Sequence, residues 1–432
     1  MCEDSKEKRS VSVDIPRYAE AVMSCLCKNG YEAFAVGGCV RDTLLRKTPN
    51  DWDVTTNALP DEMISCFREA GFTAVPTGIA HGTITVVSDG KPVEVTTYRV
   101  DGEYTDHRRP DSVRFTRNLR EDLARRDFTI NAMAYSPADG FVDLFGGVVD
   151  LEKKVIRAVG DPSVRFDEDA LRILRAIRFS SVLCFNVDEK TAEEALAMRG
   201  LLESVSRERI SSELLKLLSG KNAGHVIRDF APVIESVIPE LSGKTYAASG
   251  TVRRLFSRDV PLILAGLLAE LGDDELRRAL TGLRLPKKVG SRVFTAVVGS
   301  RGDAFPFGKP SDVRVGIKRL MSEVGAESAS DIVALRDALG KPSGYDAVLA
   351  DIIEKDECFS QRQLKINGNR LLELGALPED IGNILRELLN KVISGKIKNS
   401  DAALEAAAEE MIYAKNRACD NKSAHGKAEA EK

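Results

Sequence analysis

The chain has 432 residues, too many for one compact hydrophobic core, and this length predicts about two to four domains. Its composition, with 43% hydrophobic and 30% charged residues, is typical of globular proteins. The formal net charge of -4 excludes a global basic field, so any contact with nucleic acid must come from local positive patches.

Cysteine usage and the absence of long apolar runs favour the cytoplasm as the compartment of this protein. No apolar run reaches the roughly 18 residues of a membrane span, and the N-terminus MCEDSKEKRS is polar. We therefore expect a soluble, cytoplasmic protein without a membrane partner, whose thiols are reduced and mostly packed rather than bound to zinc or in disulfides. The eight cysteines, which form no C-x-x-C pair, are Cys2, Cys25, Cys27, Cys39, Cys66, Cys184, Cys358 and Cys419.

The first chemical motif combines a strand, a glycine turn and a helix. Residues 33–36 form an apolar run short enough for a buried strand, and Gly37-Gly38 ends it. Glycine tolerates positive φ and lets a phosphate approach the backbone. Residues 40–46 then predict a short helix, from which N-terminal amides and Arg41 face phosphate oxygens. A Gly-Gly pair alone is more often only a turn.

Two aspartates follow this helix. Asp51 and Asp53 are two residues apart, so on a strand their carboxylates point to the same face and can share hard cations such as Mg²⁺. Two such ions would stabilise the attacking and leaving oxygens of a phosphoryl transfer. A D-x-D sequence alone is more often a surface loop, and the order of the motifs is what favours the catalytic interpretation.

GGCVRD at 37–42 followed by DWD at 51–53 resembles the active-site signature of one nucleotidyltransferase branch, which contains tRNA CCA-adding enzymes and bacterial poly(A) polymerases. The resemblance implies an α+β protein with a mixed α/β nucleotidyltransferase head and a small β-sheet, followed by an all-α neck, body and tail. It also implies Mg²⁺ on Asp51 and Asp53, and a nucleotide on Gly38 and Arg41.

Residues 73–99 have the β-branched pattern of strands, with a hairpin turn at Asp89-Gly90. Glu94 alternates with Val93 and Val95, so its side chain faces away from theirs. Two interpretations stay open for Glu94: a third acidic group near the metals, or a glutamate that faces solvent.

Residues 99–115 are polar and break the periodicity, which is typical of a solvated loop. A mobile segment beside a nucleotide pocket can also couple substrate binding to closure. The resemblance supports this second role, because full CCA adders carry a flexible segment here. Its candidate residues are Asp106, Arg108 and Arg109.

The sequence RRDFTINA at 125–132 matches a further signature of the family. By resemblance, Arg126 meets the triphosphate or the sugar, while Asp127 and Asn131 orient the pocket through hydrogen bonds. Taken alone, Arg125 and Arg126 are an ordinary basic pair.

Residues 167–183 predict an amphipathic helix on which Asp169 and Arg172 are neighbours at i and i+3. A surface salt bridge is the simplest interpretation of such a pair. Chemically, Asp169 can also accept from the exocyclic amino group of cytosine or adenine while Arg172 donates to the adjacent ring nitrogen. Guanine and uracil present a carbonyl and a ring N–H there and are rejected.

By resemblance, the E-D-x-x-R sequence at 168–172 uses this pair as a protein template. Arg175 and Arg178 continue at i+3 spacing and would extend the pocket toward sugar and phosphates, although each alone is an ordinary helix arginine.

The rest of the chain is predicted to be helical, without a regular repeat. From Leu364 it resembles the tail of compact bacterial CCA-adding enzymes. The lysines of this segment either contact the tRNA backbone or form an ordinary solvated helix face. We assign 1–138 to the catalytic head, 139–220 to a base-recognising neck, 221–360 to a helical body, 361–418 to a tRNA-binding tail and 419–432 to a disordered C-terminus.

The motifs together predict template-independent addition of CCA to tRNA, gripped by its acceptor stem and upper half, from CTP and ATP with release of pyrophosphate. A poly(A) polymerase is less favoured because TGIAHG at 77–82 lacks the arginine pair those enzymes usually carry. Enzymes that add only CC or only A share the motifs and stay open. A non-catalytic RNA-binding protein is disfavoured by the intact acidic and template residues.

Overall fold

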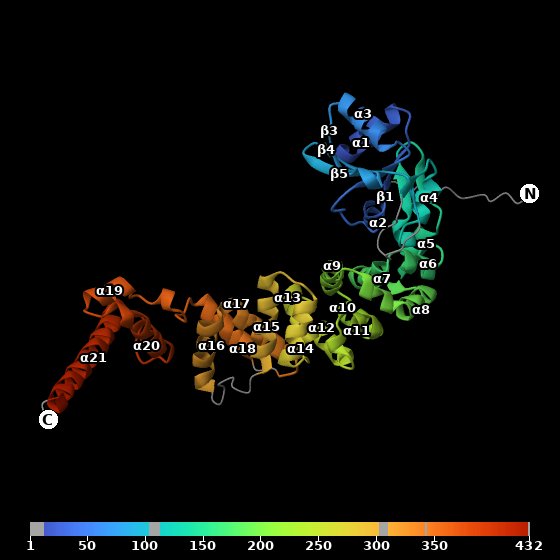
Figure 1. Ribbon diagram of the computed structural model, residues 1–432. Coiled ribbons are helices and arrows are strands. Elements are labelled where there is room, and N and C mark those ends of the chain that lie inside the picture. Colours follow the sequence, from blue (N-terminus) through green and yellow to red (C-terminus); the bar gives the residue numbers. More distant parts are fainter. Residues whose placement is uncertain (1–12, 103–112, 302–309, 342–343, 431–432) are drawn as a thin grey trace, which may run out of the picture. The chain divides into compact units, whose positions relative to one another are not determined.

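The computed structural model describes residues 13–102, 113–301, 310–341 and 344–430, and it describes no side chains at 101, 310–312 and 416–430. The chain divides into two compact units, Met1–Pro286 and Lys287–Lys432 (Figure 1). This division lies inside the range 221–360 that we assigned to one body. Across the described ranges, no helix is long and apolar enough to cross a membrane.

A seven-stranded mixed sheet forms the head, with strand order β3-β4-β5-β2-β1-β8-β9. Strands β2 and β5 are parallel, and every other neighbouring pair in this sheet is antiparallel. The strands are β1 Ala33–Val36, β2 Asp53–Thr56, β3 Thr73–Gly78, β4 Thr83–Ser88, β5 Lys91–Thr97, β8 Met133–Ser136 and β9 Gly140–Asp143. Two small sheets pair β6 (Arg99–Asp101) with β7 (Val113–Phe115) and β10 (Val155–Ile156) with β11 (Asn186–Val187).

Strand β1 is covered on both faces, which explains its uninterrupted apolar sequence. Ala33 and Ala35 belong to the core formed with helices α1 (Arg17–Lys28) and α3 (Pro60–Glu69) (Figure 1). Phe34 and Val36 belong to a second, smaller core with Leu123 of α4 (Leu119–Ala124). The glycine turn that follows β1 is therefore held between two packed layers.

Two local predictions for the head are confirmed. The run 33–36 is strand β1, and the Asp89-Gly90 turn joins β4 to β5 with both residues at positive φ, 50° and 72°. The predicted helix 40–46 is α2 (Gly38–Leu44), which begins two residues earlier and directly continues the glycine turn.

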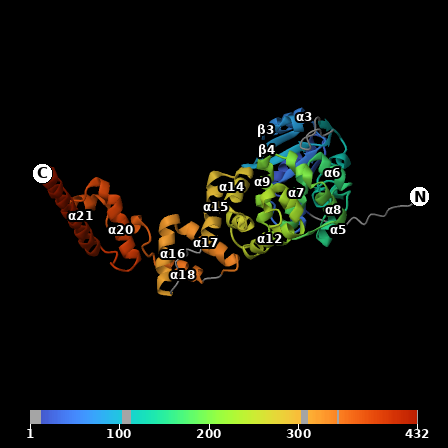
Figure 2. The ribbon, with the colours of Figure 1, turned by 60° about the horizontal axis from the view of Figure 1, so that its bottom comes forward.

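The remaining elements of this unit are helical. They are η1 Ile79–His81, η2 Thr129–Asn131, α5 Gly147–Lys153, α6 Pro162–Glu168, α7 Leu171–Leu183, α8 Glu189–Ala197, η3 Arg199–Ser204, α9 Arg207–Leu218, α10 Ala223–Asp229, α11 Ala231–Val237, η4 Pro239–Leu241, α12 Thr245–Arg254, α13 Val260–Leu268 and α14 Asp273–Gly282. Helix α9 packs along α7 (Figure 1, Figure 2).

The prediction of one continuous helix over 167–183 is wrong, because the helix is interrupted between α6, which ends at Glu168, and α7, which begins at Leu171. Asp169 adopts an extended backbone, with φ −140° and ψ 100°. Its Oδ1 accepts from the backbone N–H of Leu171 at 3.1 Å, which satisfies one of the unpaired N–H groups at the start of α7. Aspartate readily makes such local hydrogen bonds, and this ends α6 despite the apolar helical pattern.

The second unit is helical and has two apolar cores. One core joins α16 (Pro310–Val324), α17 (Ala326–Ala338) and α18 (Tyr345–Glu354), and the other joins residues from 358 to 412. The other elements are α15 Lys287–Arg301, η5 Gln361–Gln363, α19 Gly368–Glu373, η6 Pro378–Asp380, α20 Ile381–Ile393 and α21 Asp401–Ala430.

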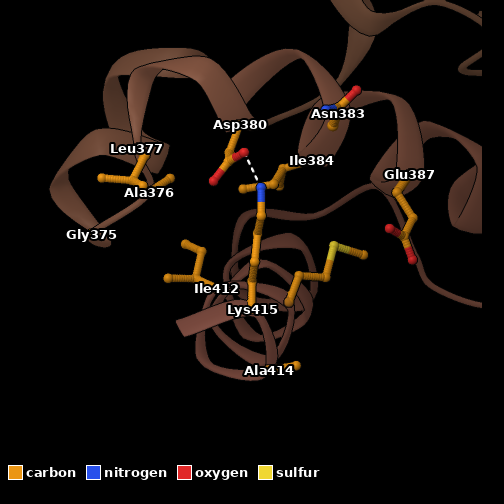
Figure 3. Close-up of a pocket in the computed structure, with 11 residues that line it drawn as sticks. Gly375, Ala376, Leu377, Asp380, Asn383, Ile384, Glu387, Ile412, Ala414 and Lys415 are labelled. Atoms are coloured by element: carbon orange, nitrogen blue, oxygen red, sulfur yellow. Dashed lines mark hydrogen bonds and ion pairs between the residues drawn. The ribbon is translucent and has the colours of Figure 1, made fainter. Parts of the chain in front are cut away.

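A cavity of about 400 Å³ lies in this unit between α21 and the segment from Gly375 to α20. Lys415 of α21 reaches across it and forms an ion pair with the buried Asp380 (Figure 3).

The C-terminal helix differs from our expectation. Helix α21 continues to Ala430, through most of the range 419–432 for which we predicted disorder. The segment is rich in alanine, which has the highest helix propensity of all residues.

The cysteines for which the structure describes side chains are all free. Cys25, Cys39, Cys66 and Cys358 are buried, and Cys27 and Cys184 are exposed.

Candidate active site

The glycine turn between β1 and α2 requires glycine at its first position. Gly37 has φ 80° and ψ −129°, a conformation that residues with a Cβ rarely adopt. A Cβ there would also lie 3.2 Å from Nη1 of Arg126. Gly38 starts α2, and a Cβ on this residue would lie 3.7 Å from Nη2 of Arg41. The turn therefore lies against two of the arginines assigned to the nucleotide.

Asp53 and Glu94 lie on neighbouring strands, and Asp51 lies two residues before the first of them. Asp53 is the first residue of β2 and pairs in register with Glu94 of the parallel strand β5, so the two side chains point to the same face. Val93 and Val95 are buried and Glu94 is exposed, as the alternation predicted. Asp51 precedes the strand, so strand alternation alone does not bring it toward Asp53.

Electrostatics show that these carboxylates act on one another. The pKa of Asp53 is raised to about 6, mainly by burial and also by the negative charges of Asp51 and Glu94, while the positive charge of Arg126 lowers it. Because two acidic neighbours disfavour the ionised form of this carboxyl group, a bound cation would relieve the repulsion and favour loss of the proton.

The donor set fits a hard divalent cation, since it consists of carboxylate oxygens. No cluster of three or more His, Cys, Asp or Glu side chains suited to a metal occurs among the described residues. Mg²⁺ is commonly bound through one or two protein carboxylates together with water and substrate phosphates, so a site with fewer than three protein carboxylates is compatible with this ion.

The arginine pair of the R-R-D motif is organised by Asp122, whose side chain is completely buried. Its Oδ1 accepts from Nη2 of Arg125 at 2.8 Å, and its Oδ2 accepts from Nη2 of Arg126 at 3.3 Å. Thr55 of β2 donates to the same carboxylate at 3.1 Å. Burial by itself raises the pKa of Asp122, but the two arginines outweigh it and hold that pKa below its ordinary value.

Asp122 was missed in the sequence, although it precedes the two arginines by three and four residues, the spacing of helical neighbours. It ties the arginine pair to strand β2, two residues from Asp53. Nε of Arg126 is buried and has no hydrogen-bond partner in the described part of the chain. This leaves Arg126 a donor for a ligand.

Asp127 and Asn131 link the head to helix α7 through hydrogen bonds. Arg175 donates to Oδ2 of Asp127 through Nε at 2.9 Å, and Asn131 donates to Oδ1 at 3.1 Å. Nη1 of Arg41 donates in turn to Oδ1 of Asn131 at 2.7 Å. Burial alone raises the pKa of Asp127, but Arg175 and Asn131 together lower it to about 2.

Three arginines surround the ring of Phe179, another residue missed in the sequence. The guanidinium carbons of Arg41, Arg175 and Arg178 lie 5.2, 5.6 and 3.6 Å from the ring centroid. Cations are attracted to the face of an aromatic ring, so Phe179 helps to hold like charges close together. Burial lowers the pKa of Arg178, although Glu213, whose carboxylate is 2.8 Å away, partly offsets this effect. Such a cluster suits a polyanion.

Asp169 and Arg172 lie at the junction of α6 and α7, but each is held by other partners. Nη1 of Arg172 donates to Glu168 at 2.6 Å and to the carbonyl of Arg165 at 3.2 Å, and Nη2 donates to the carbonyl of Arg125 at 2.9 Å. The carboxylate of Asp169 accepts from Nη2 of Arg209 on α9, at 3.0 Å. The salt bridge between Asp169 and Arg172, considered in the sequence, is not found among the described contacts.

A cavity of about 600 Å³ opens beside Asp51, on the side of the loop between α2 and β2. Arg46, Lys47 and Lys91 give it positive charge next to the carboxylate. The sequence did not single out this loop. The flexible-loop residues Asp106, Arg108 and Arg109 lie outside the described residues, between the paired strands β6 and β7.

Models of three protein families match consecutive parts of the chain. They are the poly A polymerase head domain at 33–157, the probable RNA and SrmB-binding site of polymerase A at 184–233, and the putative tRNA nucleotidyltransferase domain 2 at 261–408.

Similar curated proteins, and several similar solved structures, are CCA-adding enzymes. The CCA-adding enzyme of Lactobacillus delbrueckii subsp. bulgaricus is 37% identical over 391 residues, which cover 89% of this chain and 96% of the relative. That of Oceanobacillus iheyensis is 50% identical over 210 residues, 49% of this chain and 52% of the relative. The crystal structure of the Bacillus stearothermophilus CCA-adding enzyme in complex with CTP superposes with a TM-score of 0.76 at 30% identity, covering 93% of this chain and 99% of that one.

The Thermotoga maritima CCA-adding enzyme complexed with tRNA shares the fold, with a TM-score of 0.65 at 23% identity. The match covers 93% of this chain and 97% of that one. The resemblance inferred from the motifs and the expected fold class are confirmed. The chain belongs to the family of CCA-adding enzymes.

Proposed function

We propose that this protein adds the sequence CCA to the 3′ end of tRNA from CTP and ATP, with release of pyrophosphate. One observation carries the proposal. The template residue Arg172 donates to the backbone carbonyl of Arg125, and the next residue, Arg126, faces the acidic cluster at Asp53. Base recognition and phosphoryl transfer are therefore joined through adjacent residues of one motif.

The acidic cluster is the proposed metal site. Asp51 and Asp53 would hold Mg²⁺, with Glu94 as a weaker candidate for a third group, since its side chain shares the face of Asp53. Bound there, the metal would activate the tRNA 3′-hydroxyl and neutralise charge on the α-phosphate.

The arginines form the proposed binding site for the triphosphate. Arg126 retains an unsatisfied donor, and Arg41, Arg175 and Arg178 converge on Phe179. Gly38, at the start of α2, lets the phosphates approach the backbone beside Arg41. Their main contribution is to position the nucleotide and to neutralise the charge of the departing pyrophosphate.

The base is read by Asp169 and Arg172. In the described structure Arg172 uses Nη1 for two acceptors and Nη2 for one, so Nε and one hydrogen of Nη2 are left to donate to the ring nitrogen of cytosine or adenine. Asp169 would accept from the exocyclic amino group. Guanine and uracil would leave donor against donor and acceptor against acceptor, a mismatch that costs binding free energy.

The tRNA partner is supported by the family, and its acceptor stem and upper half would lie on the helical parts of the chain. We retain 1–138 as the head, 139–220 as the neck, 221–360 as the body and 361–418 as the tail, as a proposal. A cytoplasmic location is likewise proposed, because the described cysteines are all free.

The test offers each nucleoside triphosphate separately to tRNAs that end at the discriminator base, at C, or at CC. The expected result is addition of C, C and A followed by arrest. Growth of an open-ended A tail on arbitrary RNA would select the poly(A) polymerase alternative. Addition that stops at CC would instead indicate an enzyme that adds only CC. Addition that begins only on CC ends would indicate an enzyme that adds only A.

A further inference from the structure

The residue that holds the template carboxylate comes from a helix outside the recognised motifs. Nη2 of Arg209 on α9 lies 3.0 Å from Oδ2 and 3.3 Å from Oδ1 of Asp169. The two side chains are 28% and 18% exposed, so the ion pair is largely shielded from solvent. Nη1 of Arg209 is buried and has no hydrogen-bond partner among the described residues.

Asp169 needs such support because it lies outside both helices. Its backbone is extended, and its side chain can rotate about two bonds, so the neighbouring helical turns do not determine where the carboxylate points. The N–H of Leu171 holds Oδ1, and Arg209 bridges the two oxygens from the opposite helix. A carboxylate has about four acceptor positions, so these three contacts still leave one for the amino group of a base.

A second contact of α9 allows positioning to be separated from packing. One turn further along, Glu213 lies 2.8 Å from Nε of Arg178, which stacks on Phe179 in the arginine cluster. Arg209 and Glu213 are four residues apart and lie on the same face of α9. One of them therefore acts on the base-reading carboxylate and the other on a cation proposed for the triphosphate.

We infer that Arg209 is a positioning residue for base selection, which orients the carboxylate of Asp169 toward the exocyclic amino group of CTP and ATP. This inference rests on the proposed function. Without Arg209 the carboxylate turns freely or is drawn to the neighbouring arginines, and acceptance of the amino group weakens. Glu213, in contrast, acts on binding of the triphosphate, which all four nucleotides share.

The experiment measures equilibrium binding and kcat/KM for CTP, ATP, GTP and UTP in Arg209→Ala, Arg209→Lys and Glu213→Gln. We expect Arg209→Ala to lower the preference for C and A over G and U about 10-fold to 100-fold, the range of one well-formed base contact. Arg209→Lys keeps a positive donor but not the planar fork, and should restore part of the preference. Glu213→Gln should weaken all four nucleotides alike.

Arg284→Ala is the matched control, because this arginine pairs with Glu208, next to Arg209, at an exposed site. The KM for tRNA and the melting temperature of the Arg209 variants should match those of this control. Wild-type selectivity in Arg209→Ala, or equal relaxation by Glu213→Gln, would overturn the inference. A wild-type protein that binds nucleotides but adds none to tRNA would overturn the proposed function instead, and the binding measurements would still decide the role of Arg209.

Discussion

Asp53 gives the sharpest quantitative prediction, because the ionised carboxylate that is proposed to bind the metal lowers the stability of the fold. Its pKa is raised from 3.8 to about 6, first by burial and then by Asp51 and Glu94. A carboxyl group whose pKa is higher in the folded state favours folding most when protonated. This contribution is fully present below pH 3.8 and is lost as the pH rises through about 6.

The magnitude follows from the two pKa values. At 1.36 kcal/mol for each pH unit, the difference between 3.8 and about 6 corresponds to at most about 3 kcal/mol of unfolding free energy. Asp53→Asn keeps the shape of the side chain and removes its charge. We expect this variant to lose nucleotidyl transfer and to gain up to about 3 kcal/mol of stability at pH 7.5 in EDTA.

The assay is urea unfolding of the wild type and Asp53→Asn between pH 5 and 8, with EDTA and with excess Mg²⁺. In EDTA the gap between the two proteins should widen as the pH rises toward about 6 and stay constant above it, and Mg²⁺ should stabilise only the wild type. Asp229→Asn, at a surface carboxylate that is 53% exposed, is the control and should show neither effect. An Asp53→Asn variant that is less stable than the wild type at pH 7.5 in EDTA, or that transfers nucleotides normally, would refute this reasoning.

Three further variants test the rest of the site. Asp169→Ala combined with Arg172→Ala should reduce the preference for C and A over G and U by roughly 10-fold or more in single-nucleotide incorporation, and unchanged selectivity would contradict the template role. Asp122→Ala should lower the unfolding free energy by about 3 to 5 kcal/mol, because two largely buried arginines lose their counter-ion, and urea unfolding measures this loss. Gly37→Ala should cost about 1 to 3 kcal/mol of backbone strain and should raise the KM for CTP by displacing Arg126, so a variant with wild-type stability and KM would show that the turn tolerates a Cβ.

The local features of the site could be predicted because they depend on residues close together in the chain. The apolar run that becomes β1, the turn at Asp89-Gly90 and the outward facing of Glu94 follow from periodicity and turn chemistry. The acidic pair and the motif arginines were identified from their order and spacing.

Other features were decided by tertiary structure. Asp169 is held by Arg209, 40 residues away, and Arg172 donates to the carbonyl of Arg125, 47 residues away. Asn131 accepts from Arg41 across 90 residues. No local pattern encodes such pairings, because they depend on which helices pack together.

The sequence by itself therefore determined which residues are proposed for the chemistry: the acidic pair, the arginines and the template pair, with their order along the chain. Tertiary structure decided how each group is held. It brought Arg209 to Asp169, joined Asp122 to Thr55 of β2, and gathered Arg41, Arg175 and Arg178 around Phe179. The physical reason is that an ionic side chain takes its orientation from whichever partner lies within hydrogen-bond reach, and only folding brings those partners together.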